Sequence, residues 1–229
     1  ATAASLIAKR GALMARHTTP GDMIAVQADE LQVQKYLSAC RFNRIGIAAI
    51  NGPKNTVVSG DKAEIASFIS LLAPARIGVR PLAVSHAFHS PLMQPMLHAF
   101  AQEFSGVNLH NPDISFVSAQ SGVVEAAAFS QQQYWVDHVR NPVKFVSAVQ
   151  TLLSMKPDIV IEIGPAPVLI NMAQQLVQNG AIVFGASIAQ NAENATLADT
   201  MAKLAAAGME LKWRDVFAER ASDRNLRRR

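Results

Sequence analysis

The strongest constraint on the fold is a series of six short segments between residues 23 and 85, in which strand-like and helix-like patterns alternate. The strand-like runs are short, apolar and bounded by turn residues, whereas the helix-like runs repeat apolar residues every three or four positions. Their order predicts a ferredoxin-like βαββαβ unit, in which two helices cover one face of a sheet. The six segments are residues 23–28, 29–40, 44–53, 56–61, 62–73 and 77–85.

The segments on either side of this unit predict a second, α/β unit. Helices are expected over residues 1–15, 91–104, 134–139, 141–155, 168–180 and 195–208, with strands over residues 114–119, 157–165 and 181–187. The run "PDIVIEIGP" (157–165) is almost continuously apolar, which is typical of a buried parallel strand. We therefore expect an α/β fold in which a small unit, residues 21–86, is inserted between residues 1–20 and 87–212.

Composition and length restrict the class of protein. The chain has 229 residues, of which 50% are hydrophobic and 17% are charged, as in a globular protein that buries a core. Its apolar runs are too short to cross a bilayer, and its first residues do not resemble a secretory signal. The single Cys40 excludes an internal disulfide framework and favours a reducing, cytoplasmic location. The chain begins without Met in a helix-like pattern, so we expect it to be part of a longer protein.

The net charge of +4 is concentrated near the end of the chain. Residues 214–229 contain six arginines against three acidic residues, a net charge of +3, and the body is therefore nearly neutral. Residues 213–229 are expected to form a solvated basic linker, with an electrostatic docking arm as the alternative. This distribution does not favour a nucleic-acid partner.

Two histidines, His86 and His89, lie where the last strand of the small unit gives way to a helix. They can serve as packing residues, or one of them can transfer protons. A serine hydroxyl is a poor nucleophile at neutral pH and needs an adjacent base. Histidine, with an ordinary pKa of about 6.5, is well matched to that task.

Five motifs follow one another in an order that resembles a known family. They are "RGALM" (10–14), "NGPKNTVVSGD" (51–61), "VSHAFHSPLM" (84–93), "YWVDHVRNPVKF" (134–145) and "IEIGPAPVL" (161–169). Together they resemble the acyltransferase domain of type I modular polyketide synthases, which is related to malonyl-CoA:acyl-carrier-protein transacylases. The resemblance covers about residues 1–217. It implies a hydrolase-like α/β subdomain with an inserted ferredoxin-like one and an active site between them.

The resemblance also implies a catalytic role for two histidines. His89 matches the family's catalytic base, which activates a serine that carries the acyl group as an ester. His138 matches a residue whose main-chain carbonyl orients that base, much as a carboxylate does in a Ser-His-Asp triad. An ordinary histidine at a helix end is the alternative for His138.

Three further residues are assigned to substrate binding by the resemblance. Arg10 matches the arginine that binds the free carboxylate of malonyl or methylmalonyl groups, for which a planar fork of donors is suited. His86 and Phe88 match selectivity positions, and "HAFH" is the form that accompanies malonyl units. Phe88 would occupy the space that an α-methyl group needs, a preference of about 1–3 kcal/mol.

The implied partners are malonyl-CoA, an acyl carrier protein with its phosphopantetheine thiol, and neighbouring synthase domains. No metal and no further cofactor are implied. One departure matters: no G-x-S-x-G elbow occurs in these residues, and neither Ser85 nor Ser90 lies in a strand–turn–helix elbow. In the family the elbow lies upstream of the position of Ala1. We therefore expect that the isolated chain is inactive and needs the N-terminal segment.

Three alternatives remain open at this point. A non-catalytic interaction or scaffold fragment of the same fold would contact carrier or neighbouring domains. An RNA-binding module would share the βαββαβ order, but its central strands need aromatic residues that these strands lack. A metal site could use His86, His89 and His98, although no carboxylate or cysteine stands at a convincing ligand spacing.

Overall fold

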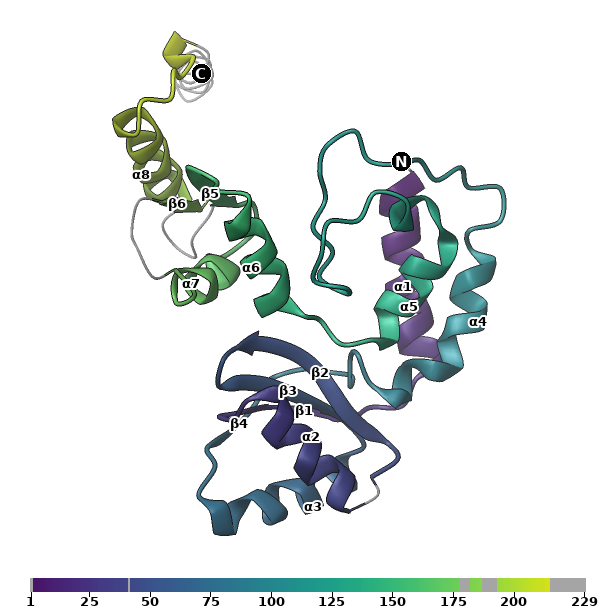
Figure 1. The fold of residues 1–229 in the computed structure, drawn as a ribbon. Helices are drawn as coiled ribbons and strands as arrows, with labels where there is room; N and C mark the ends of the chain where they lie inside the picture. The colour runs from purple at the N-terminus through teal and green to yellow at the C-terminus, as the bar shows by residue number, and fades with distance from the viewer. Residues whose placement is uncertain (1, 41, 178–181, 187–192, 215–229) are drawn as a thin grey trace, which may run out of the picture. The chain divides into compact units, whose positions relative to one another are not determined.

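The structure is a computed structural model that describes residues 2–40, 42–177, 182–186 and 193–214, and Figure 1 shows its helices and strands. Helices and strands alternate along the chain, so the α/β class is confirmed. The chain divides into two compact units, Ala1–Met155 and Lys156–Arg229, each described by itself below. None of the helices within the described ranges is long and apolar enough to cross a bilayer.

A four-stranded antiparallel sheet organises the first part of the first unit. Its strands are β1 (Asp22–Val26), β2 (Ile45–Gly52), β3 (Asn55–Gly60) and β4 (Val79–Pro81), and they lie side by side in the order β2-β3-β1-β4. Helix α2 (Glu30–Ala39) links β1 to β2, and α3 (Lys62–Leu72) precedes β4. This is the βαββαβ order that the sequence predicts, and the strand order is that of a ferredoxin-like unit.

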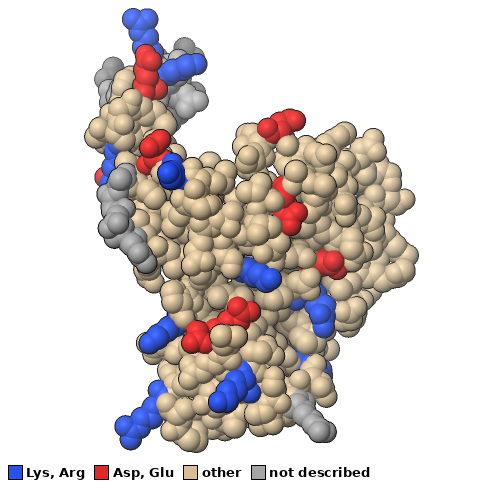
Figure 2. Space-filling view, viewed as in Figure 1, with Lys and Arg blue, Asp and Glu red and all other residues tan. Residues whose placement is uncertain are grey.

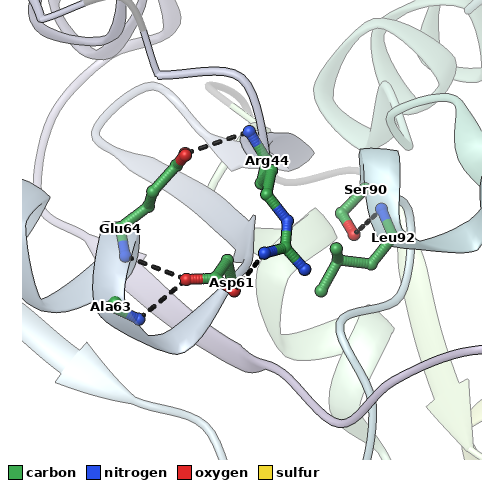
Figure 3. Close-up of polar contacts among 6 residues, drawn as sticks. All are labelled: Arg44, Asp61, Ala63, Glu64, Ser90 and Leu92. Atoms are coloured by element: carbon green, nitrogen blue, oxygen red, sulfur yellow. Dashed lines mark hydrogen bonds and ion pairs between the residues drawn. The ribbon is translucent and has the colours of Figure 1, made fainter.

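Side-chain caps explain where the two helices of this sheet begin. Asp29 accepts a hydrogen bond from the backbone N–H of Gln32 at the start of α2. Asp61 caps the start of α3: its carboxylate accepts hydrogen bonds from the N–H groups of Ala63 and Glu64, as Figure 3 shows. The Arg44 guanidinium lies 3.2 Å from the second oxygen of Asp61.

The two faces of the sheet are different. Ile24 and Val26 of β1 point toward α2 and α3 and pack in a core with Phe68 and Leu72, which are fully buried. Because side chains alternate along a strand, Met23 points to the opposite face, where it packs with Ala48, Val57, Leu82 and Phe88. We call this second surface the open face of the sheet.

The remainder of the first unit is helical. Helices α1 (Thr2–His17), α4 (Gln94–Gln102) and α5 (Gln132–Arg140) pack together, as Figure 1 shows, and the short helix η2 (Pro91–Met93) leads into α4. Their contact is an apolar cluster that includes Met14, Met93, Met96, Phe100 and Val139. Helix α6 (Phe145–Ser154) follows α5 and contacts β2.

Two elements of the first unit differ from expectation. The predicted strand over residues 114–119 is only a single bridge between Val117 and Val124, because Ser118 enters a tight turn at once. The helix predicted from residue 141 begins at Phe145 instead. Val143 exchanges backbone hydrogen bonds with Ala48 and Ile50 of β2, and this bridge keeps residues 141–144 extended.

The second unit contains strands β5 (Ile159–Glu162) and β6 (Val183–Ala186), paired in parallel, and helices α7 (Val168–Gln174) and α8 (Glu193–Ala206). The run over residues 157–165 is not the buried strand that its composition predicts, since Ile161 is 42% exposed and Ile163 is 88% exposed. Two parallel strands cover too little surface to bury both of their faces. The predicted basic linker is described only as far as Arg214, and residues 215–229 lie outside the described ranges.

The first compact unit contains residues on both sides of the predicted small unit. Residues 87–155, expected in one subdomain with residues up to 212, belong to the first unit. The contacts between α1, α4 and α5, and those between α6 and β2, explain why this stretch groups with the sheet. On the face shown in Figure 2, the Lys and Arg side chains of the described residues are spaced apart and mixed with Asp and Glu.

Candidate active site

His89 lies in a tight turn between β4 and η2, with a left-handed backbone of φ 54°. Few residues other than glycine adopt this conformation, although histidine does so more often than most, and such strain persists only where the surroundings enforce it. Here Ala87 is fully buried, and the turn lies so close to β1 that a Cβ on Gly21 would come within 2.7 Å of the Ala87 Cβ. The backbone at His89 is therefore held in place from both sides.

Ser90 holds the same turn from the other end. Its hydroxyl donates to the Ala87 carbonyl over 2.6 Å and accepts from the N–H of Leu92 over 3.2 Å, a contact that Figure 3 shows. The residue is 1% exposed. Both hydrogen-bonding functions of its hydroxyl are used by the backbone, so Ser90 is a capping residue and not a free nucleophile.

The imidazole of His89 is oriented by a backbone carbonyl. Its Nδ1 lies 2.9 Å from the carbonyl oxygen of Asn141, the residue that follows the end of α5. Because a carbonyl can only accept, Nδ1 carries the proton of the neutral ring, which leaves Nε2 with its lone pair. The bridge between Val143 and β2 fixes the backbone just beyond Asn141. Nε2 is thus prepared to act as a base.

His138 lies beside His89, with ring centroids 5.7 Å apart and planes nearly perpendicular. Burial, and next the neighbouring His89 and Arg10, lower the pKa of His138 to about 4, so this ring is neutral at physiological pH. The sequence assigned the orienting carbonyl to His138. Nδ1 instead donates its hydrogen bond to the carbonyl of Asn141, and the main chain of His138 adds a smaller contribution that raises the pKa of His89.

Sequence reasoning missed Asn141. A signal for it was present, because the last carbonyls of a helix have no partner within the helix and Pro142 ends α5 there. Several carbonyls at such an end can accept from a nearby imidazole. The choice among them depends on how the chain leaves the helix, which the sequence motif alone does not specify.

Arg10 comes from helix α1, far from the histidines in sequence, and the structure brings it close to them. Burial lowers the pKa of its guanidinium, and its positive charge lowers the pKa values of both His89 and His138. The side chain is half-buried, so it is partly desolvated. A buried cation of this shape is suited to bind a carboxylate through two hydrogen bonds.

The pKa of His89 is lowered from its ordinary value. Burial is the main cause and the charge of Arg10 adds to it, whereas the carbonyl of Asn141 and the main chain of His138 act in the opposite direction. The neutral, basic form therefore persists to a lower pH than it would for an exposed histidine. This is the form that can accept a proton from a hydroxyl group.

The two residues predicted to set selectivity, His86 and Phe88, lie in the same turn. Phe88 is half-buried and belongs to both the cluster between α1, α4 and α5 and the cluster on the open face of the sheet. His86 lies 6.3 Å from Phe88, measured between ring centroids, and its Nδ1 lies 3.0 Å from the Ser85 hydroxyl. Arg10, Phe88, His89 and His138 therefore share one region of the first unit, with His86 at its edge.

A cavity of about 420 Å³ adjoins this region on the side of Asn141. The Oε1 atom of Gln120, one of its lining residues, is buried without a hydrogen-bond partner. The described residues contain no group of three side chains that could hold a metal ion. The cavity is lined by Gln120, Ser121, Glu125, Tyr134, Asn141, Pro142 and Lys144.

A base held by a carbonyl beside a half-buried arginine suits acyl transfer from an acid-bearing thioester. Comparison with known proteins agrees with this class. Residues 1–215 match the family "Acyl transferase domain", and the chain belongs to this family. It is 35% identical over 224 residues to polyketide synthase GfsB of Streptomyces halstedii and 37% identical over 221 residues to the type I synthase Pks15/1 of Mycobacterium marinum.

These matches cover nearly all of this chain but little of the relatives. They include 94% of the chain and 4% of GfsB, and 95% of the chain and 10% of Pks15/1. Among solved structures, the acyltransferase domain from the second module of the salinomycin polyketide synthase has a TM-score of 0.88 and 33% identity, and 97% of this chain matches 52% of it. The malonyl-CoA:acyl-carrier-protein transacylase of Clostridium perfringens shares the fold, with a TM-score of 0.78 and 21% identity.

Proposed function

We propose that this chain supplies the base, the carboxylate-binding arginine and the selectivity residues of a malonyltransferase that works within a polyketide synthase. The substrate would be malonyl-CoA, and the acceptor would be the phosphopantetheine thiol of an acyl carrier protein. The observation that carries this proposal is the hydrogen bond from His89 Nδ1 to the Asn141 carbonyl. Arg10 is close enough for its charge to lower the pKa of this histidine.

The proposed reaction has two halves. In the first half, Nε2 of His89 takes the proton of a serine hydroxyl as the oxygen attacks the thioester carbonyl, and the protonated imidazole then gives that proton to the departing CoA thiolate. In the second half, the same nitrogen takes the proton of the carrier thiol, which attacks the acyl-serine ester. The proton returns to the serine, so the enzyme is regenerated.

Arg10 gives the proposal its substrate class. A malonyl group ends in a carboxylate that an acetyl group lacks, and a half-buried guanidinium without a carboxylate partner provides a reason to prefer it. Arg10 takes part in none of the ion pairs between described residues. Phe88, packed between two clusters, favours malonyl over methylmalonyl groups because an α-methyl would need its space.

The serine itself must come from outside these 229 residues, since they contain no G-x-S-x-G. The chain spans about half of the salinomycin domain that it matches. The short β5–β6 sheet, with Ile161 and Ile163 exposed, is also consistent with a need for further strands. We propose that the isolated chain is inactive and that a serine-elbow segment completes it.

The experiment compares the isolated chain with a chimeric domain, in which the serine-elbow segment of the salinomycin domain precedes Ala1. Both are incubated with radiolabelled malonyl-CoA and then with a holo-acyl carrier protein. The isolated chain is expected to retain no label, and the chimeric domain is expected to become labelled and to pass the label to the carrier. A non-catalytic scaffold would gain no activity from the added segment.

A further inference from the structure

The open face of the sheet changes from apolar to basic along β1. At the beginning of the strand, Met23 packs with Leu82 and Phe88, next to the turn that carries His89. Two residues further along, Ala25 lies opposite Arg80 of β4. Beyond the end of β1, Gln27 pairs with Gly78, so its side chain projects from this same face. The far end of the open face is therefore polar.

A pocket of about 390 Å³ occupies this far end. The Gln27 side chain lies over the backbone of Gly78, just before β4, since a Cβ on Gly78 would come within 2.6 Å of its Oε1 atom. The ionisable side chains of the lining are both cations, Lys54 and Arg80. The pocket is lined by Ala25, Val26, Gln27, Lys54, Asn55, Gly78, Val79 and Arg80.

Neither cation is neutralised. Both side chains are exposed, and the ion pairs between described residues engage other lysines and arginines. The amides of Gln27 and Asn55 add neutral hydrogen-bond donors to the same lining. A guanidinium, an ammonium and amides around a small pocket are the groups that bind a phosphate ester.

The distance between this pocket and the active-site turn fits one kind of substrate. Met23 and Gln27 are four residues apart, which in a strand corresponds to about 13 Å. A pantetheine arm has about thirteen bonds between its phosphorus and its sulfur, and at about 1.2 Å per bond of extended chain it spans about 16 Å. An arm laid along the open face would thus join the two ends.

We propose that the pocket between Lys54 and Arg80 binds the phosphate of the pantetheine arm while the thioester lies at the Phe88 end. The inference rests on the proposed function, because only a pantetheine thioester needs both ends. The same phosphate ester occurs in CoA and on a carrier protein. Both substrates of the two half-reactions would then use one track along the sheet.

The test measures binding to the 229-residue chain by calorimetry and by ¹⁵N-resolved NMR. The probes are 4′-phosphopantetheine, pantetheine without the phosphate, CoA, and a holo-acyl carrier protein. The double substitution Lys54→Gln and Arg80→Gln is expected to weaken the binding of 4′-phosphopantetheine about three- to tenfold, the size of effect that exposed charge contacts have. The affinity for pantetheine is expected to be unchanged. Lys35→Gln, an exposed lysine on α2 behind the sheet, is the matched control and is expected to have no effect.

The outcomes separate this inference from the proposed function. If the double variant binds CoA, the carrier protein or both more weakly than the wild type does, the pocket is supported, and the affected probe shows which molecule supplies the phosphate. The pocket is overturned if 4′-phosphopantetheine binds no more tightly than pantetheine, or if the double variant binds 4′-phosphopantetheine as tightly as the wild type does. In either case malonyl transfer by the chimeric domain is still decided by its own assay. Loss of transfer with phosphate binding intact overturns the function and leaves the pocket standing.

Discussion

His89 and Asn141 are 52 residues apart in the sequence, yet Nδ1 of the first lies 2.9 Å from the carbonyl oxygen of the second. The contact joins the turn after β4 to the end of α5, and the bridge between Val143 and β2 supports it from behind. A carbonyl orients the imidazole without the negative charge that a carboxylate would bring. The base is therefore fixed in its tautomer but is not made more basic by an adjacent anion.

The pH dependence of malonyl transfer follows from this arrangement. In the proposed mechanism the neutral form of His89 is the active one. Burial together with Arg10 lowers its pKa, so the acid limb of kcat/KM is expected below pH 6.5. Once a malonyl carboxylate neutralises Arg10, the lowering by that charge disappears. The acid limb of kcat is then expected at a higher pH than that of kcat/KM, which steady-state rates of the chimeric domain from pH 4.5 to 8 would measure.

The control for the pH experiment is Arg10→Gln, which removes the charge permanently. In that variant the acid limb of kcat/KM is expected to move to higher pH, because the charge that lowers the pKa of His89 in the free enzyme is gone. An acid limb of kcat/KM that stays in place would show that Arg10 does not act on His89.

Arg10 is expected to set the preference for a carboxylate. Replacing it with Gln removes a charge-assisted contact, and kcat/KM for malonyl-CoA should fall about 10- to 100-fold while the slow reaction with acetyl-CoA is unchanged or faster. Arg10→Lys should recover only part of the loss, since an ammonium cannot offer the planar fork. Arg16, which is exposed on the same helix, provides the control substitution Arg16→Gln. Equal losses for both acyl groups would contradict this role.

Phe88→Ala is expected to admit methylmalonyl groups. The ratio of kcat/KM for methylmalonyl-CoA to that for malonyl-CoA should rise by up to about 10- to 100-fold, the discrimination that one methyl group permits in an apolar pocket. Because Phe88 is half-buried between two clusters, the free energy of unfolding should fall by about 1–3 kcal/mol. Phe42→Ala, in the core on the helix side, should lower stability without changing the ratio.

Ser90→Ala tests whether this serine is structural. Loss of its two hydrogen bonds in a buried turn should lower the free energy of unfolding by about 1–2 kcal/mol, as measured by denaturant unfolding. Transfer by the chimeric domain should continue at a reduced rate, because the turn that carries His89 loses its support. Ser67→Ala, whose exposed hydroxyl donates to the Ala63 carbonyl, should change neither quantity appreciably. Stable malonylation at Ser90 in the isolated chain would refute the assignment.

Local patterns predicted the sheet well because each of its elements carries its own signal. Alternating apolar residues, the caps Asp29 and Asp61 and the turn at Pro53-Lys54 all act within a few residues of the structure that they specify. The failures have long-range causes. Val143 resembles the start of a helix in the sequence, but it pairs with β2, about ninety residues earlier, and this tertiary contact overrides the local preference.

The candidate site divides in the same way. The resemblance nominated His89 as the base, together with Arg10, Phe88, His86 and His138, but no local pattern indicates that α1 brings Arg10 to these histidines. The orienting carbonyl of Asn141 was missed because every residue has a backbone carbonyl, so a sequence motif does not indicate which one accepts the hydrogen bond. The left-handed backbone at His89 was also beyond local prediction, and it lies between Ala87 and Ser90, which are both buried.

The most direct measurement is single-turnover malonyl transfer by the chimeric domain with His89 intact and with His89→Ala. We expect the wild type to move radiolabel from malonyl-CoA to the carrier thiol and the variant to be about 10²- to 10⁴-fold slower, the contribution of a positioned general base, while His98→Ala on the exposed face of α4 transfers normally. A chimeric domain that transfers no label, or one whose rate is the same with and without the His89 imidazole, would contradict the account.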